Sequence, residues 1–444
     1  MRYYAFIRSF TIQGFKSIKH LSLTLNPGLN ILVGANAAGK SNILEALYFL
    51  RHALVDEADS IPYRPHAPLY WSALDLLYQR DPTTPLRLGL SIDVYRVEGG
   101  ACSVNKLEYM VTFAYDEAGD TLYPVEHRIM LDDSLVLEVS TDRVKTYTRH
   151  DVAERAGVKG RREDEWIVTE IEWRAPRPLI PWRMPLQQYC SMRGSLWRCE
   201  LRLMWSEKRV VFVVPEEGSS CRRPIGYSYT APSLMMLFSH IVRILSGIVM
   251  LKHPDIAAIG EPRPFTGAKR LDVRARNLAE VLLTLIAERG ALPERIADAL
   301  RELFPGCSVK VETGFGRVAL VATENGLRLP PPNMPDGLVK LLAILAAIEL
   351  NPTLLLIDEI ENSLHAKMLE YLVDELDSLQ IPVIVATHSP IPVDLVDPED
   401  VIVVKREAQG TTASRLPDPQ KLRETLAREG ILLSDYVIYH ETGG

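Results

Sequence analysis

The chain has 444 residues, which is enough for two or three domains and a sizeable core. Hydrophobic residues make up 47% of the sequence and charged residues 24%, the proportions of an ordinary soluble globular protein. A formal net charge of −7 gives no global basic signature of nucleic-acid binding, although a local basic groove is compatible with it.

The cysteines and the N-terminus favour a reducing cytoplasm. The five cysteines are an odd number without CxxC or Cys/His ligand spacing, so neither a disulfide framework nor a zinc site is indicated. The opening MRYYAFIRSF is too poor in apolar residues for a signal peptide. The most apolar later stretch, residues 233–251, contains His240 and Arg243 and predicts a buried helix followed by a strand, with a membrane span as the alternative.

The N-terminal part of the chain predicts a phosphate-binding loop. After strand signals in FTIQGF and LSLTL, the stretch LNILVGANAAGKSNILEAL at 29–47 contains G-x-x-x-x-G-K-[ST] between a buried strand and a helix. In such a loop, backbone N–H groups surround phosphate oxygens, Lys40 reaches the β and γ phosphates, and the Ser41 hydroxyl ligates Mg²⁺. The alternative is a glycine-rich turn without a ligand. The predicted nucleotide-binding residues are Gly34, Asn36, Ala37, Ala38, Gly39, Lys40, Ser41 and Asn42.

From about 86 to 215 the apolar residues recur with a period of two. Leu86, Leu88 and Leu90 alternate with polar or small residues, and further short strands are predicted at RIML, LVLEV, WIVTEIEW, SLWRCELRLMW and VVFVV. This region is predicted to be an antiparallel meander. Its arginine pairs at 161–162 and 222–223 could contact phosphate or a partner's acids, although such pairs are usually solvated surface.

The part from about 236 to 444 is first helical and then α/β. A helix face that begins at Leu278 ends at Gly290, and a second helix ends before Pro305. A nearly all-apolar helix then leads into the run 354–357, which stops at Asp358 and Glu359. A continuous apolar run that ends in two acids is typical of a central parallel strand with functional groups at its carboxyl end.

These strand ends predict hydrolytic chemistry. Asp358 can hold Mg²⁺, usually through water, while Glu359 accepts a proton from the water that attacks the γ-phosphate. The strand in IPVIVATHSP delivers His388, which is well placed to contact the same phosphate. The alternatives are solvated carboxylates and a structural histidine.

The motifs GANAAGKS, LLLIDEIENSLHAK and ATHSP, separated by a long insertion, resemble the ABC-type ATPase heads of the SMC, RecF and OLD (overcoming lysogenization defect) families. The resemblance covers 7–57 and about 236–410 and is greatest for OLD-type ATPases. It implies an α/β P-loop ATPase head with an inserted antiparallel β meander and a helical subdomain. The expected divisions are 1–57 (head, Walker A), 58–235 (β-rich remainder and insertion), 236–330 (helical subdomain) and 331–444 (signature, Walker B, switch histidine).

The resemblance also implies roles for individual residues. The 34–41 loop matches Walker A, Asp358 and Glu359 match Walker B, His388 matches the switch histidine, and 361–365 matches the D-loop. MPDGL at 334–338 lies where these families place the signature, whose Asp336 and Gly337 would contact ATP held by an opposite subunit. The expected assembly is thus an ATP-sandwich homodimer or higher oligomer. Pro335 replaces a signature serine, and a plain Pro-Asp-Gly turn is the alternative. Lys16 and Ser17 match an N-terminal element of these heads.

Features that the chain lacks narrow the function. No heptads predict an SMC-like coiled coil, and too few residues follow Asp400 for the Toprim nuclease domain of OLD nucleases. The expected function is a Mg²⁺-dependent ATPase that acts on duplex DNA in repair or phage defence. The alternative is a sensor and scaffold that holds and releases a separately encoded nuclease or toxin. A transporter function is not favoured, because no membrane domain is predicted.

Overall fold

A computed structural model of the chain describes residues 2–56, 72–98, 101–132, 134–140, 143–150, 154, 159–163, 166–172, 186–193, 196–203, 209–215, 219–220, 234–330 and 333–437. The arginine pair 222–223 and the end of the tail, 438–444, lie outside these residues. The chain divides into two compact units, Met1–Leu25 with Glu45–Ser246 and Glu407–Thr412, and Asn26–Leu44 with Gly247–Arg406 and Ala413–Gly444.

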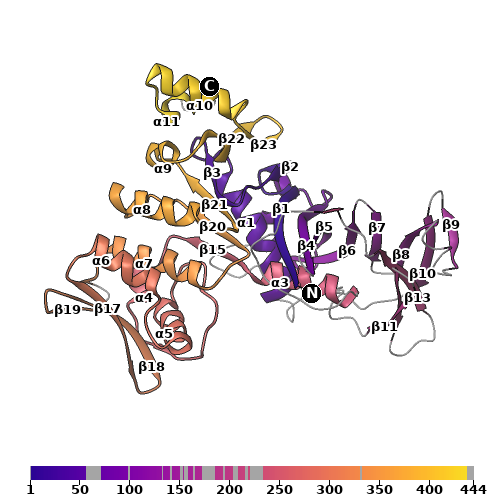
Figure 1. Cartoon of the computed structure of the whole chain (residues 1–444), viewed down its shortest axis with the longest axis horizontal. Coiled ribbons are helices and arrows are strands. Elements are labelled where there is room, and N and C mark those ends of the chain that lie inside the picture. The colour runs from indigo at the N-terminus through magenta and orange to yellow at the C-terminus, as the bar shows by residue number, and fades with distance from the viewer. Residues whose placement is uncertain are drawn as a thin grey trace. The chain divides into compact units, whose positions relative to one another are not determined.

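The first unit contains the predicted antiparallel meander, whose strands from 186 to 215 form a separate three-stranded sheet, while those from 86 to 172 are confirmed in a ten-stranded sheet (Figure 1). Every described pairing in this sheet is antiparallel. Its main path runs β2 (Ile18–Thr24), β1 (Arg2–Phe15), β4 (Leu86–Glu98), β5 (Ala101–Asp116), β6 (Thr121–Leu131), β7 (Ser134–Ser140), β8 (Arg143–Arg149), β10 (Trp166–Glu172) and β9 (Arg161–Glu163), and β14 (Ser219–Ser220) pairs with β5.

The period of two in the sequence corresponds to one buried face of this sheet. Leu86, Leu88 and Leu90 on β4 are buried, while Arg87 between them is exposed. The sequence did not indicate that β1, which precedes the phosphate-binding loop, pairs along its length with β4. The N-terminal strands therefore belong to the antiparallel sheet.

Among the described residues, this unit also contains a small sheet and several helices. The sheet has the order β11 (Leu186–Arg193), β12 (Leu196–Leu203), β13 (Arg209–Pro215). The helices are η1 (His52–Asp56), η2 (Ala73–Leu76), η3 (Tyr78–Arg80) and α3 (Leu234–Ser246). The apolar stretch near residue 240 is thus α3 followed by strand β15 (Ile248–Lys252), as predicted. Among the helices of the described residues, none is long and apolar enough to cross a bilayer.

The second unit is built on a six-stranded sheet with the order β15, β20 (Leu354–Asp358), β21 (Pro382–Thr387), β3 (Gly28–Val33), β22 (Val401–Glu407), β23 (Gly410–Arg415). β15, β20, β21, β3 and β22 pair in parallel. β3, β20 and β21 are buried at every position, as the continuous apolar runs predict. The predicted α/β fold with an antiparallel meander is confirmed.

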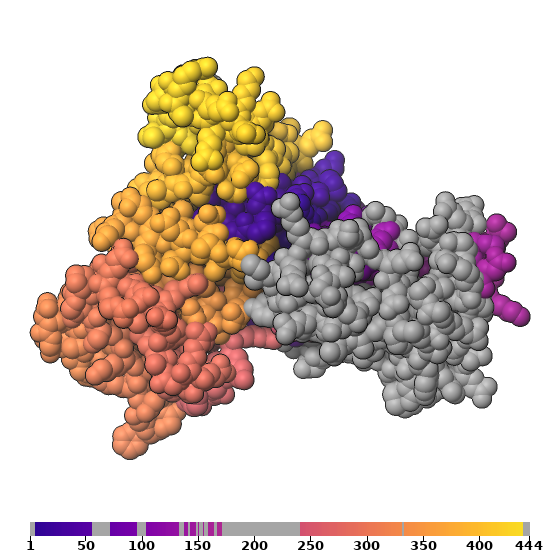
Figure 2. Space-filling view, viewed as in Figure 1, coloured from indigo at the N-terminus to yellow at the C-terminus, as the bar shows by residue number. Residues whose placement is uncertain are grey.

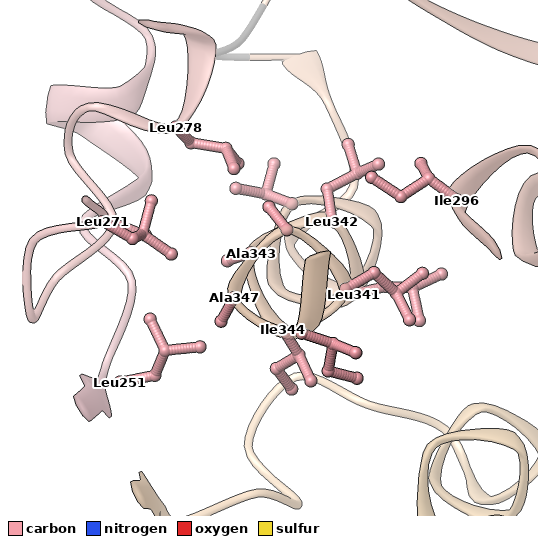
Figure 3. Close-up of a cluster of buried hydrophobic side chains, with 14 of the residues drawn as sticks. Leu251, Leu271, Leu278, Ile296, Leu341, Leu342, Ala343, Ile344 and Ala347 are labelled. Atoms are coloured by element: carbon pink, nitrogen blue, oxygen red, sulfur yellow. The ribbon is translucent and has the colours of Figure 1, made fainter. Parts of the chain in front are cut away.

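Helix α7 (Asp336–Glu349) lies at the centre of the largest apolar cluster of this unit (Figure 3). Leu251, Leu278 and Ile296 surround it from three other segments (Figure 3). Because α7 is covered all round, nearly every one of its positions is apolar. The other helices are α1 (Lys40–Arg51), which follows β3, and α4 (Ile256–Ile259), α5 (Leu278–Arg289), α6 (Glu294–Leu303), α8 (Ala366–Asp377), α9 (Pro390–Asp394), η6 (Pro398–Asp400), α10 (Pro419–Glu429) and α11 (Leu433–Tyr436).

A small antiparallel sheet accompanies α5 and α6. Its strands are β16 (Arg263–Pro264), β18 (Arg317–Glu324), β17 (Cys307–Gly314) and β19 (Leu327–Leu329). The β17–β18 hairpin forms the projection at the lower edge of the orange region in the space-filling view (Figure 2). Phe315 at its tip is fully exposed.

Candidate functional site

The predicted phosphate-binding loop connects β3 to α1. Gly34 packs against β22 so closely that an added Cβ would lie 2.2 Å from the Val404 carbonyl oxygen, so the backbone requires glycine here. Ala37, with φ of 62°, and Gly39, with φ of 111°, turn the loop toward the first N–H groups of α1. These are the groups that bind anions at a helix N-terminus.

Lys40 spans this loop from the first position of α1. Its Nζ donates hydrogen bonds to the carbonyl oxygens of Gly34, at 2.8 Å, and Ala35, at 3.1 Å. Burial lowers the pKa of Lys40, and the negative charges of Asp358, Glu361 and Glu359 partly oppose that shift. The ammonium group is therefore held between the loop and the acidic strand end.

Ser41 and Asp358 meet beneath the loop, as the sequence predicts for a magnesium site. The Ser41 Oγ donates to Asp358 Oδ1 at 3.1 Å, and Asp358 at the end of β20 is buried. A hydroxyl and a carboxylate oxygen at this separation fit the oxygen ligands that Mg²⁺ prefers. Lys252, at the end of β15, lies with its Nζ 3.6 Å from Asp358 Oδ2 and adds a positive charge that the sequence did not point to.

Glu359 begins a tight turn after β20. Its φ of 52° is a left-handed conformation that non-glycine residues rarely adopt. The carboxylate accepts a hydrogen bond from the Asn362 side-chain amide, and its Oε2 lies 3.3 Å from His253 Nε2. Lys340 on α7 donates to the main-chain carbonyls at both ends of this turn, Glu359 and Asn362. The predicted catalytic base is therefore fixed through both its side chain and its backbone.

Glu361 connects this turn to the end of β21. Its carboxylate accepts hydrogen bonds from the Thr387 hydroxyl and the His388 N–H, both at 2.9 Å. The Nδ1 of His388 lies 2.8 Å from Glu361 Oε1, and the histidine side chain is 49% exposed. Glu361 thus orients the ring that the sequence predicts will contact the γ-phosphate.

The residues predicted to form the signature lie at the start of α7. Pro335 caps the helix and Asp336 is exposed in its first turn. Gly337 is buried, and an added Cβ would lie 2.7 Å from the Ser363 carbonyl oxygen. The first turn of α7 is therefore packed directly on the segment that follows Glu359.

Lys16 and Ser17, the remaining predicted residues, contact residues outside the predicted nucleotide site. Lys16 forms an ion pair with Glu45 on α1, and Ser17 Oγ lies 2.7 Å from Thr411 Oγ1. Both contacts lie within the unit that holds the antiparallel sheet.

A cavity of about 280 Å³ adjoins the loop, lined by Val33, Gly34, Ala35, Asn36, His388, Ser389, Pro390, Val393 and Ser434. The first half of the predicted Walker A loop and the predicted switch histidine therefore line the same cavity. A larger open hollow of about 840 Å³ is lined by residues of 397–399 and 418–424 and contains none of the predicted site residues.

The sequence analysis did not predict Lys252, His253 and Lys340 as site residues. It also did not predict the contact between Glu361 and His388. Lys252 ends a strand next to β20, so the rule that locates Asp358 could also have located Lys252. Lys340 is the single charged residue between the acidic ends of an apolar helix, a signal that needs only the sequence.

Two family models match the chain. The model described as "AAA domain, putative AbiEii toxin, Type IV TA system" matches residues 237–394, and the model described as "AAA ATPase domain" matches residues 6–76. The first covers the positions predicted as signature, Walker B and switch histidine, and the second covers the predicted Walker A loop.

Curated relatives are RecF proteins. The chain is 29% identical over 199 residues to the DNA replication and repair protein RecF of Roseiflexus castenholzii, a match covering 44% of this chain and 47% of that relative. It is 44% identical over 45 residues to the RecF of Lactobacillus acidophilus, which covers 10% of this chain and 12% of the relative. The matched region thus spans about half or less of these relatives.

Among solved structures, SMC heads are similar to this chain. An Smc head bound to the C-terminal winged-helix domain of ScpA has a TM-score of 0.48 at 13% identity and covers 94% of this chain and 99% of that one. The SMC head domain of Thermotoga maritima has a TM-score of 0.37 at 11% identity, over 93% and 99% of the two chains.

Proposed function

We propose that this chain, a P-loop ATPase head of the SMC and RecF type, hydrolyses ATP at the strand ends of its parallel sheet. The observation that carries the proposal is the register of three adjacent strands. Val33 pairs with Thr387 across β3 and β21, and Asp358 pairs with Ala386 across β20 and β21. The loop, the two acids and the histidine therefore leave the sheet at one edge, where open α/β sheets bind ligands.

The loop binds the triphosphate in this proposal. Its N–H groups and the Lys40 ammonium balance charge on the β and γ phosphates. Ser41 and Asp358 would hold Mg²⁺, which would offset negative charge on the phosphate oxygens. The contact between these two side chains supports that assignment.

Glu359 is the proposed general base. It takes a proton from water as the water oxygen bonds to the γ-phosphorus, and the bond from that phosphorus to the β–γ bridging oxygen breaks. His388 donates to the γ-phosphate oxygens as charge builds there. Its contact with Glu361 supports this role, because the carboxylate fixes the ring with one nitrogen turned away.

The proposed active assembly is an ATP-sandwich dimer. The N-terminus of α7, with Asp336 and Gly337, would approach ATP held by a second copy and direct the positive end of its helix dipole at the γ-phosphate. The exposed first turn at Asp336 supports this role. Pro335 offers no hydroxyl to that phosphate, so we expect slow turnover.

We propose that the work of this ATPase is done on duplex DNA, in repair or phage defence of the OLD type. The name of the RecF relatives, DNA replication and repair protein, supports a DNA-related role. A second candidate is a sensor and scaffold for a separately encoded nuclease or toxin. The description of the family model over 237–394, which names a toxin–antitoxin system, favours this candidate.

One experiment separates the two. ATP turnover is measured with and without linear duplex DNA at two salt concentrations, and the rate of Lys40→Ala is subtracted as contaminating activity. A stimulation that falls steeply with salt supports the DNA-acting ATPase, because phosphate contacts release counterions. A rate that DNA leaves unchanged supports the scaffold, whose protein partner would then co-purify with the chain.

A further inference from the structure

Lys340 is a buried cation outside the predicted catalytic set. Its exposed fraction is 5%, and it lies in the second turn of α7, whose positions from Gly337 to Ile348 are all buried. A buried ammonium is costly unless hydrogen bonds compensate for lost water. A helix packed on all sides would be more stable with an apolar residue at this position, so packing alone does not explain the lysine.

Those contacts all lead to one turn. The Lys340 Nζ donates to the carbonyl oxygen of Glu359 at 2.7 Å and to that of Asn362 at 2.9 Å. The Asn362 N–H in turn donates to the Glu359 carbonyl at 3.3 Å. The ammonium therefore ties together both ends of the turn that begins at the proposed base.

The turn needs such support because its backbone is strained. Glu359 at the start of the turn and Ser363 directly after its end have φ values of 52° and 63°, in the left-handed region. A non-glycine residue there costs of order 1–3 kcal/mol and persists only where surrounding contacts hold it. The carboxylate of Glu359 is 36% exposed, so its position depends on the backbone as well as on Asn362 and His253.

The charge on Lys340 suits this task at neutral pH. Burial lowers its pKa to about 8, and Glu361, Glu359 and Asp358 oppose the shift. The protonated form, with three donors, therefore predominates at pH 7.

We infer that Lys340 is a positioning residue that holds the turn from Glu359 to Asn362 in the conformation that aims the Glu359 carboxylate at the attacking water. The inference rests on the proposed hydrolytic role of Glu359. Gly337, one turn earlier, packs on the Ser363 carbonyl. Helix α7, which would approach ATP held by a second copy, thus also positions the Glu359 carboxylate of its own site.

The test compares Lys340→Met, which keeps the length and removes the ammonium, with Lys340→Arg, which keeps charge and donors. Rates are expressed per ATP-binding site, so a partly unfolded preparation lowers the number of sites and not kcat. We expect Lys340→Met to lower kcat about 10- to 100-fold, the effect of misplacing a catalytic group by about 1 Å. ATP affinity should stay within about threefold of wild type, and Lys340→Arg should recover part of kcat.

Two further variants separate positioning from general destabilisation. Leu342→Ala removes a fully buried side chain from the same helix and changes neither Lys340 nor any residue of the turn, so it should lower Tm while leaving kcat per site within about twofold. In the Glu359→Gln background, Lys340→Met should reduce the residual rate no further, because its effect runs through Glu359.

A wild-type kcat for Lys340→Met, or a full additional loss in the Glu359→Gln background, would overturn the inference and leave the proposed ATPase intact. Normal hydrolysis by Glu359→Gln would instead remove the proposed base, and with it the ground for the inference.

Discussion

The parallel sheet and the ten-stranded antiparallel sheet bury their side chains in different ways. β3, β20 and β21 are buried at every position, so their side chains can act only where the strands end. β4 and β6 alternate buried positions with more exposed ones over part of their length, as at Arg87 and Arg128. In the parallel sheet, polar residues therefore lie together at the strand ends, whereas in the antiparallel sheet they are spread along the strands. The sequence indicates chemistry only for the parallel sheet.

The sharpest test of this difference is Glu359→Gln. The amide keeps the size of the side chain but cannot accept the proton, so we expect kcat to fall about 10²- to 10⁴-fold with ATP binding retained. Single-turnover hydrolysis with labelled ATP measures both. A matched change on the antiparallel sheet, Glu126→Gln, should leave both unchanged; an equal loss in the two variants would contradict the comparison.

The second test is the pH dependence of stability, which we expect to depend on a buried histidine of the antiparallel unit. Burial lowers the pKa of His240 on α3 from 6.5 to about 4, so below pH 6.5 the unfolded chain takes up a proton that the folded chain does not. The stability present above pH 6.5 should fall by roughly 3 kcal/mol as pH drops to 4. Urea unfolding across this range measures it.

His240→Phe is the control for that test. Because the phenyl ring does not titrate, this variant should lose less stability than wild type between pH 6.5 and 4. An identical pH dependence for the two proteins would show that other groups account for it.

A third test adds one methyl group to the loop at the edge of the parallel sheet. In Gly34→Ala the new Cβ would meet the Val404 carbonyl oxygen, so we expect a loss of about 1–3 kcal/mol in the free energy of unfolding and weaker ATP binding. Calorimetry with and without ATP measures both. Gly314→Ala is the matched control, since nothing lies within 4 Å of its added Cβ and its backbone is outside the left-handed region.

The smallest expected effect comes from the core of the antiparallel sheet. The Tyr109 hydroxyl and His127 Nδ1 lie 2.8 Å apart on β5 and β6, and burial raises the pKa of Tyr109 well above its usual value. Tyr109→Phe removes this hydrogen bond and should cost about 1 kcal/mol of stability. ATP turnover at 25 °C should not change, and a tenfold drop would mean that this sheet takes part in catalysis.

Motif spacing and strand periodicity predicted much of the fold and site from particular residues. The apolar run before Gly34 and the run before Asp358 each marked a buried strand and its functional end. Alternation at Leu86, Leu88 and Leu90 marked the antiparallel sheet. These signals are local, and each depends on a few consecutive residues.

Other features depend on pairing between distant residues. Nothing within 2–15 indicates that β1 pairs with β4, because strand partners are chosen by the whole sheet. His253 resembles any exposed residue after a strand until β15 is placed beside β20. The contact between Lys340 and the Glu359 turn likewise joins residues 19 positions apart, on two different elements.

The most direct test of the central claim is the Mg²⁺-dependent ATP turnover rate of the purified wild-type chain against Lys40→Ala prepared identically. The account predicts measurable phosphate release by wild type, its loss in Lys40→Ala, and its loss when Mg²⁺ is removed by chelation. Equal rates for the two proteins, or release that persists without Mg²⁺, would contradict a hydrolytic site at the strand ends of the parallel sheet.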